Sequence, residues 1–187
     1  QIYDAVKEED SEAKVAGPNI ADYNRWEMET FIKFAIENDC MPDVITWHEL
    51  YQSDGDFMVS WDGHLEHYRS LEEQYGFTRK VVVNEYAKFH DNGTPGQLIQ
   101  WISRFENSKV YACLPFWYLA NSLNELVADA NKPNGAWWLY KWYADMTGDT
   151  VPVETYNVNE DGMYGLVALD EDKETTYVCL LYTSPSP

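Results

Sequence analysis

The chain has 187 residues, of which 45% are hydrophobic, 16% aromatic and 24% charged. This composition supplies enough apolar side chains for a core, so it excludes a disordered tail, a collagen-like repeat and a disulfide-stapled miniprotein. The 13 Lys and Arg are outnumbered by 32 Asp and Glu, which gives a formal net charge of -19. Because this charge repels phosphate groups, we expect neither nucleic acid nor an anionic membrane as a partner.

The aromatic residues point to a different class of ligand. The 8 Trp and 14 Tyr side chains offer flat apolar faces, and the many carboxylates accept hydrogen bonds from hydroxyl groups. Both properties suit a neutral carbohydrate, which is the partner that the composition favours. The 3 cysteines lack the C-x-x-C spacing of a zinc site, and they do not suggest a disulfide framework.

A helical pattern over residues 2–12 comes first along the chain, and strand patterns then alternate with helical patterns. The predicted strands cover residues 14–18, 43–49, 80–85 and 109–117, and the predicted helices cover 26–37, 65–75, 95–105 and 134–146. Short apolar strands that each precede a helix predict an α/β fold with parallel strands. Either a doubly wound sheet or a (β/α)8 TIM barrel has this pattern.

Polar and aromatic residues at the strand ends favour the barrel. Asn19, His48, Glu85 and Trp117 stand at or just after the ends of the four predicted strands, where the loops of a barrel build its active site. A complete barrel takes about 250 residues. The pattern changes at Gly148, so residues 1–148 are predicted to be the C-terminal half of a TIM-barrel catalytic domain.

The rest of the chain has a different sequence pattern, without helical segments. Strand patterns at 150–156, 163–169 and 175–181 alternate with acidic turns, so residues 149–178 are predicted to begin an all-β sandwich domain. Residues 179–187 resemble a translated sequencing adapter. We interpret them as an artefact of a metagenomic fragment and leave them out of the fold analysis.

Five motifs in order carry a resemblance to a known family. They are Val15-Ala-Gly-Pro, the strand from Asp43 to His48, Val83-Asn-Glu-Tyr, Pro115-Phe-Trp and Lys132-Pro, followed by the β-domain pattern. In this order the chain resembles retaining glycoside hydrolases of the (β/α)8 clan over residues 1–178. The resemblance is strongest to glycoside hydrolase family 39, the β-xylosidase and α-L-iduronidase group.

The resemblance implies a polysaccharide-degrading glycosidase with Glu85 as its nucleophile. Glu85 follows three valines, so its carboxylate is expected at the rim of an apolar barrel, where ionisation is unfavourable unless the group is used or paired. The resemblance also implies that the general acid/base lies in an Asn-Glu pair upstream of Gln1, so that this fragment alone is inactive. The alternative is a non-catalytic carbohydrate-binding barrel or pseudo-enzyme.

His48 and Glu49 end the second predicted strand of the β/α series. Side chains alternate along a strand, so only one of the two can face the barrel axis. The resemblance favours His48 as a donor to substrate or nucleophile, although a structural role is also open for it. Glu49 is the alternative acid/base if it faces inward.

Further candidate substrate contacts are Trp117, as a stacking platform for a sugar ring, with Asn19, Asn121 and Tyr86. The helical spacing of Trp137, Trp138, Leu139 and Trp142 predicts a core face rather than a ligand site. We predict a solvated helix face for His64 and His67, with no metal site and no cofactor. A polysaccharide substrate favours an extracellular location.

Overall fold

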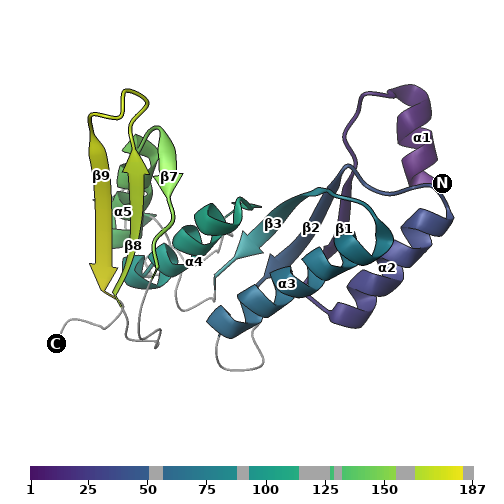
Figure 1. Ribbon diagram of the computed structural model, residues 1–187, viewed down its shortest axis with the longest axis horizontal. Coiled ribbons are helices and arrows are strands. Elements are labelled where there is room, and N and C mark those ends of the chain that lie inside the picture. The colour runs from purple at the N-terminus through teal and green to yellow at the C-terminus, as the bar shows by residue number, and fades with distance from the viewer. Residues whose placement is uncertain (51–56, 88–92, 114–126, 129–131, 155–162, 183–187) are drawn as a thin grey trace. The chain divides into compact units, whose positions relative to one another are not determined.

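The computed structural model describes residues 1–50, 57–87, 93–113, 127–128, 132–154 and 163–182 (Figure 1). The chain divides into two compact units, Gln1–Tyr86 and Ala87–Pro187. In the described part of the chain, no helix is long and apolar enough to cross a membrane. The fold class is α/β, with a parallel sheet and helices in the first unit and a small antiparallel sheet in the second.

The first unit alternates helices and strands. Its elements are α1 (Ile2–Glu9), β1 (Ala16–Ile20), α2 (Arg25–Glu37), β2 (Val44–Glu49), α3 (Phe57–Tyr75) and β3 (Lys80–Tyr86). Strand β2 lies between β1 and β3 and is parallel to both. The predicted parallel arrangement is therefore confirmed for these three strands. Helix α3 begins earlier than the predicted helix over 65–75, and β1 extends past Pro18 so that Asn19 lies within it.

Helices α2 and α3 lie side by side and cover one face of this sheet (Figure 1). Met28, Ile32 and Ala35 are buried at the helical spacing of α2. On β2, Trp47 is 0% exposed, and its ring packs 6.3 Å from that of Trp61 and 5.7 Å from that of Tyr68 in α3. The alternation of β2 therefore directs Ile45, Trp47 and Glu49 toward the helices, and the residues between them toward the opposite face.

A buried carboxylate joins the end of α3 to the start of β3. Glu72 is 7% exposed and accepts hydrogen bonds from the Tyr68 hydroxyl at 2.9 Å and from the backbone N–H of Arg79 at 2.7 Å. Burial raises the pKa of Tyr68, so this hydroxyl remains a donor.

The second unit contains α4 (Pro95–Ser108), β4 (Tyr111–Ala112), β5 (Val127–Ala128), β6 (Lys132–Pro133), α5 (Gly135–Asp145), β7 (Asp149–Val151), β8 (Met163–Leu169) and β9 (Thr176–Tyr182). Strands β7, β8 and β9 form an antiparallel sheet in that order. Helix α4 packs against β8 and buries Leu98, Trp101 and Phe105. Strand β9 includes residues 179–182, which are the first four of the residues interpreted as an adapter.

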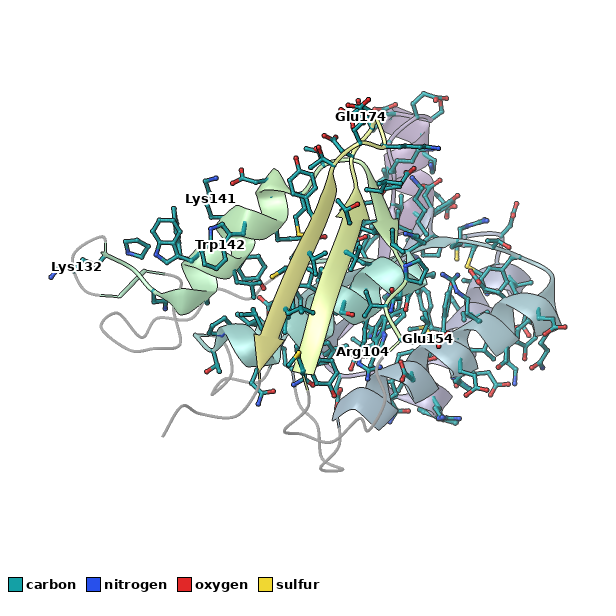
Figure 2. All side chains as sticks on the ribbon, turned by 60° about the vertical axis from the view of Figure 1, so that its left-hand side comes forward. Arg104, Lys132, Lys141, Trp142, Glu154 and Glu174 are labelled. Carbon is teal, nitrogen blue, oxygen red and sulfur yellow. The ribbon has the colours of Figure 1, made fainter. Side chains whose placement is uncertain are left out.

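The prediction of a buried tryptophan face on α5 is wrong in part. Leu139 is buried, but Trp138 is 43% and Trp142 52% exposed. Figure 2 shows Trp142 and Lys141 projecting from this helix. The helical spacing correctly placed these side chains together, and the rings of Trp138 and Trp142 lie 6.0 Å apart. Spacing alone does not say how wide a stripe its neighbours cover.

Asp43 connects α1 and the start of β1 to the start of β2. Its carboxylate accepts a hydrogen bond from the backbone N–H of Val15 at 2.9 Å and one from the Lys7 ammonium at 3.1 Å. The Val15 N–H first, and then the Lys7 ammonium, hold the pKa of the Asp43 carboxyl below its ordinary value. The ionised form is therefore preferred in the folded chain.

Replacing Asp43 with Asn should lower the free energy of unfolding at neutral pH by about 1 kcal/mol, because the charge-assisted hydrogen bonds are lost. A lowered pKa stabilises the fold above the unfolded-state pKa, and this contribution disappears as the pH falls through the folded-state value. Urea unfolding at pH 7 and at acid pH should show a difference between the two proteins that shrinks toward acid. Glu37→Gln removes a charge at an exposed helix end and is the matched control for the change in net charge.

Candidate active site

An irregularity in β3 positions the candidate nucleophile. Trp47 pairs with Val83, but the next residue of β2, His48, pairs with Glu85, so Asn84 is an extra residue in β3. In a regular strand, Glu85 would share the helix-covered face with Val81 and Val83. A bulge resets this alternation and re-aims the side chains that follow it. Glu85 thus lies beside His48, on the face opposite α2 and α3.

Strand β1 has a second irregularity at the neighbouring position. Pro18 pairs with Thr46 and Ile20 with Trp47, so Asn19 is the extra residue, and its φ of 60° lies in the left-handed region. Asn tolerates this conformation better than most residues. Its side-chain oxygen accepts hydrogen bonds from the Thr46 hydroxyl and from Nδ2 of Asn84, the latter at 2.7 Å. One amide oxygen therefore connects all three strands.

The Glu85 carboxylate is partly accessible and has a basic neighbour. Its side chain is 40% exposed, and its Oε2 lies 3.5 Å from Nδ1 of His48, whose side chain is 23% exposed. A carboxylate in this setting can approach a ligand while an imidazole orients it. The structure thus brings together three predicted residues, Asn19, His48 and Glu85, at the C-terminal ends of adjacent parallel strands.

Glu49 occupies the other face of β2. Its side chain is 0% exposed, and its Oε1 accepts hydrogen bonds from the indole N–H of Trp47 at 2.7 Å and from Nδ1 of His64 at 2.9 Å. The prediction that His64 lies on a solvated face is therefore wrong, since this imidazole packs onto a buried carboxylate. His67 is also engaged, through a 2.7 Å hydrogen bond between its Nδ1 and the Tyr23 hydroxyl.

The remaining predicted residues divide into two groups. Tyr86 is described and is 3% exposed, and its backbone pairs with Glu49. Trp117 and Asn121 lie outside the described residues. Within the described ranges, no group of three or more His, Cys, Asp or Glu side chains is arranged to hold a metal ion.

Sequence reasoning missed three side chains that support the site, namely Thr46, Asn84 and His64. The first two are polar residues in otherwise apolar strands, and such residues often mark a functional face. His64 carried a weaker signal, because its partner Glu49 is 15 residues away and the pairing depends on how α3 lies on the sheet.

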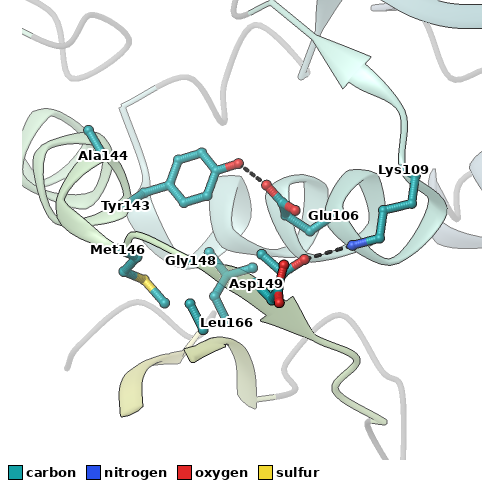
Figure 3. A pocket seen from close by; sticks show the side chains of 10 residues that line it. Glu106, Lys109, Tyr143, Ala144, Met146, Gly148, Asp149 and Leu166 are labelled. Carbon is teal, nitrogen blue, oxygen red and sulfur yellow. Dashed lines mark hydrogen bonds between the residues drawn. The ribbon is translucent and has the colours of Figure 1, made fainter. Parts of the chain in front are cut away.

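The second unit has a separate pocket of about 470 Å³ (Figure 3). Helix α4 contributes Glu106, which accepts a hydrogen bond from the Tyr143 hydroxyl. Lys109 donates to the Thr150 hydroxyl at 2.7 Å on the other side of the pocket. Its described lining residues include none of the side chains predicted for the site.

The arrangement in the first unit is typical of enzymes with parallel α/β folds. In parallel α/β folds the catalytic side chains stand at the C-terminal ends of the strands, and a carboxylate there serves as nucleophile, acid or base. The comparisons with known proteins agree with this class. No protein-family model matches the chain.

Two curated relatives are glycosidases. The chain is 38% identical over 176 residues to a 3-O-beta-L-arabinopyranosyl-alpha-L-arabinofuranosidase from Bifidobacterium pseudocatenulatum, covering 92% of the chain and 18% of that protein. It is 37% identical over 168 residues to a 3-O-alpha-D-galactosyl-alpha-L-arabinofuranosidase from Bifidobacterium longum subsp. longum, covering 88% of the chain and 14% of that protein. The chain is thus homologous to a part of glycoside hydrolases, and it spans less than a fifth of either relative.

Solved structures share the fold of this chain. N2152 from Neocallimastix frontalis matches 99% of the chain with a TM-score of 0.83 at 34% identity, and the match covers 46% of N2152. A family 39 β-xylosidase from Caulobacter crescentus has a TM-score of 0.62 at 15% identity, with 90% of the chain and 42% of the xylosidase covered. At this identity the xylosidase shows a shared fold, so the structural resemblance to part of a family 39 glycosidase is confirmed.

Asn19 allows a direct test of the polar connection among the strands. Asn19→Ala removes the acceptor used by Thr46 and Asn84. It also places alanine, which has a Cβ but no polar side-chain group, at a left-handed φ. Asn19→Gly removes the same acceptor without that strain. We expect urea unfolding to show a loss of about 1 kcal/mol for Gly and a larger loss for Ala. Equal losses would mean that the left-handed backbone contributes nothing.

Proposed function

We propose that this chain is part of a retaining O-glycosidase in which Glu85 is the nucleophile. The observation that carries the proposal is the bulge at Asn84, which turns an accessible Glu85 carboxylate toward His48 at the C-terminal strand ends. Homology to glycosidases supports the reaction class.

In the proposed reaction, one Glu85 oxygen attacks the anomeric carbon of the substrate. The bond from this carbon to the leaving-group oxygen breaks, and a general acid gives that oxygen a proton. The product is a glycosyl ester of Glu85. Water, deprotonated by the same acid/base group, then attacks the anomeric carbon and releases Glu85 as a carboxylate, so the sugar keeps its original configuration.

The neighbouring side chains have supporting roles in this proposal. His48, whose Nδ1 lies 3.5 Å from Oε2 of Glu85, orients the Glu85 carboxylate. Asn84, held by Asn19, presents an amide next to the nucleophile and suits a contact with a sugar hydroxyl. Trp117 and Asn121 remain proposed substrate contacts, whereas Tyr86, which is 3% exposed and pairs with Glu49, does not suit this role.

A retaining mechanism needs a second carboxylate about 5–5.5 Å from the first. Glu49 does not suit this role, because its side chain is buried on the helix side of β2. Following what the resemblance to family 39 glycosidases implies, we propose that the acid/base is supplied by a segment preceding Gln1 in a longer protein.

The two curated relatives favour one substrate class. Their names describe α-L-arabinofuranosidases that act on arabinofuranosyl units substituted at the 3-O position by a further sugar. We propose the same class here, in an extracellular polysaccharide. An unsubstituted β-xyloside, which the family 39 resemblance alone would suggest, is the competing substrate.

A chimera provides the test. The matching segment of the Bifidobacterium pseudocatenulatum relative is replaced by this chain, and hydrolysis of aryl 3-O-β-L-arabinopyranosyl-α-L-arabinofuranoside and of aryl β-xyloside is measured. We expect turnover of the first, with retention seen by NMR. Glu85→Gln should lower kcat by at least about 10⁴-fold, because the nucleophile is lost while binding persists. The exposed Glu73→Gln in α3 is the matched control and should leave kcat unchanged.

Covalent labelling identifies the nucleophile independently of the mutants. A slow 2-deoxy-2-fluoro glycoside of the same sugar should add one glycosyl mass to the chimera, and peptide mapping should locate it on Glu85. A label on another carboxylate, or a product of inverted configuration, would contradict the assignment. A folded chimera that binds the sugar but neither hydrolyses it nor becomes labelled would instead support the non-catalytic carbohydrate-binding alternative.

A further inference from the structure

We infer that Glu49 is a positioning residue. Together with His64 it fixes the end of β2 from the helix side and thereby holds His48 beside Glu85. This inference rests on the proposed function, in which Glu85 is the nucleophile. It gives Glu49 a role without contact with the substrate, in place of the acid/base role considered from the sequence.

The first argument is the burial of the Glu49 carboxylate. A fully buried carboxylate is unfavourable unless donors replace the lost water. Among the described residues, donors to this carboxylate are the Trp47 indole on the same strand and the His64 imidazole on α3. His64 also lies 3.2 Å from the second carboxylate oxygen. The carboxylate therefore connects the C-terminal end of β2 to α3, the helix that covers it.

The second argument is that His64 is itself held in place. Its ring stacks on Tyr23 with centroids 4.7 Å apart and planes 23° apart. The Tyr23 hydroxyl bonds to Nδ1 of His67, one turn further along α3. Burial raises the pKa of Tyr23, so its hydroxyl stays a donor. Burial, with the nearby Arg25 charge, lowers the pKa of His67, so that imidazole stays neutral and accepts.

The third argument is the place of Glu49 in the sheet. Glu49 pairs with Tyr86 in the register that also pairs His48 with Glu85, directly after the bulge. Its backbone makes an antiparallel bridge to Asp22 on the opposite side. Consecutive side chains of a strand point to opposite faces, so a side chain fixed at Glu49 limits the rotation of the strand that carries His48. Displacing a catalytic group by about 1 Å can lower a rate about 100-fold.

A merely structural role predicts a different result, and Glu72 supplies the matched control. Glu72 is another buried carboxylate of the same unit, held by Tyr68 and Arg79 at the other end of β3. Removing either carboxylate should reduce the folded fraction. Only removal of Glu49 should slow the enzyme molecules that do fold.

The experiment compares Glu49→Ala, Glu49→Gln and Glu72→Ala in the chimera. Active sites are counted with the 2-fluoro glycoside, so kcat is obtained per labelled site. We expect Glu49→Ala to lower kcat per site by roughly 10- to 100-fold with KM changed far less, as found for misplaced catalytic groups. Glu49→Gln keeps an acceptor oxygen and should restore most of this loss. Glu72→Ala should reduce the number of sites and leave kcat per site unchanged.

Two outcomes would overturn the inference. One is an unchanged kcat per site in both Glu49 variants, which would make the carboxylate structural only. The other is an equal loss in Glu49→Ala and Glu72→Ala, which would make the effect general to this unit. If Glu49→Ala yields no folded protein, His64→Gln weakens the same contact and is expected to lower kcat per site. Failure of the proposed function is recognised separately, because the unmutated chimera would then carry no label on Glu85.

Discussion

One extra residue in β3 decides which face of the sheet the Glu85 carboxylate takes in the first unit. Without Asn84 as a bulge, regular alternation would send Glu85 to the same face as Val83, against the helices. With it, the carboxylate meets His48 across the strand pair. The bulge at Asn19 in β1 works with it, because the Asn19 amide oxygen accepts from both Thr46 and Asn84. The two bulges therefore set the direction of the side chains that follow them, which is a common effect of bulges near active sites.

Two carboxylates at the end of the sheet illustrate what a change of face does. Glu85 is 40% exposed and has one imidazole neighbour, so it can reach a ligand. Glu49 is 0% exposed and is held by Trp47 and His64, so its charge is satisfied inside the fold. Their backbone positions lie close together in adjacent strands, yet their surroundings suit different tasks. Burial with strong donors fixes geometry, whereas partial exposure leaves a lone pair available for reaction.

The second unit differs from the first in its packing and in the groups that line its pocket. Helix α4 packs its apolar face on β8, and the antiparallel strands β7, β8 and β9 run next to one another. Its pocket holds paired groups, Glu106 with Tyr143 and Lys109 with Thr150, rather than an accessible carboxylate beside an imidazole. Among the described residues, the candidate catalytic groups therefore lie in the first unit, and the homology to glycosidases extends over both units.

The sequence by itself determined the alternation of strands and helices, the parallel class of the first sheet and the polar residues at the strand ends. These follow from local periodicity and from the largely apolar runs at 44–47 and 81–83, which need no knowledge of distant contacts. The motifs also indicated a glycosidase, in agreement with the curated relatives.

Only the tertiary structure decided which face each side chain takes. Period-two alternation correctly separates His48 from Glu49, but it misplaces Glu85, because a bulge depends on how two strands pair. The partner of Glu49 lies on α3, so helix docking was needed to bring His64 inside. The exposure of Trp138 and Trp142 has the same cause, since burial depends on what packs against a helix as well as on its own periodicity.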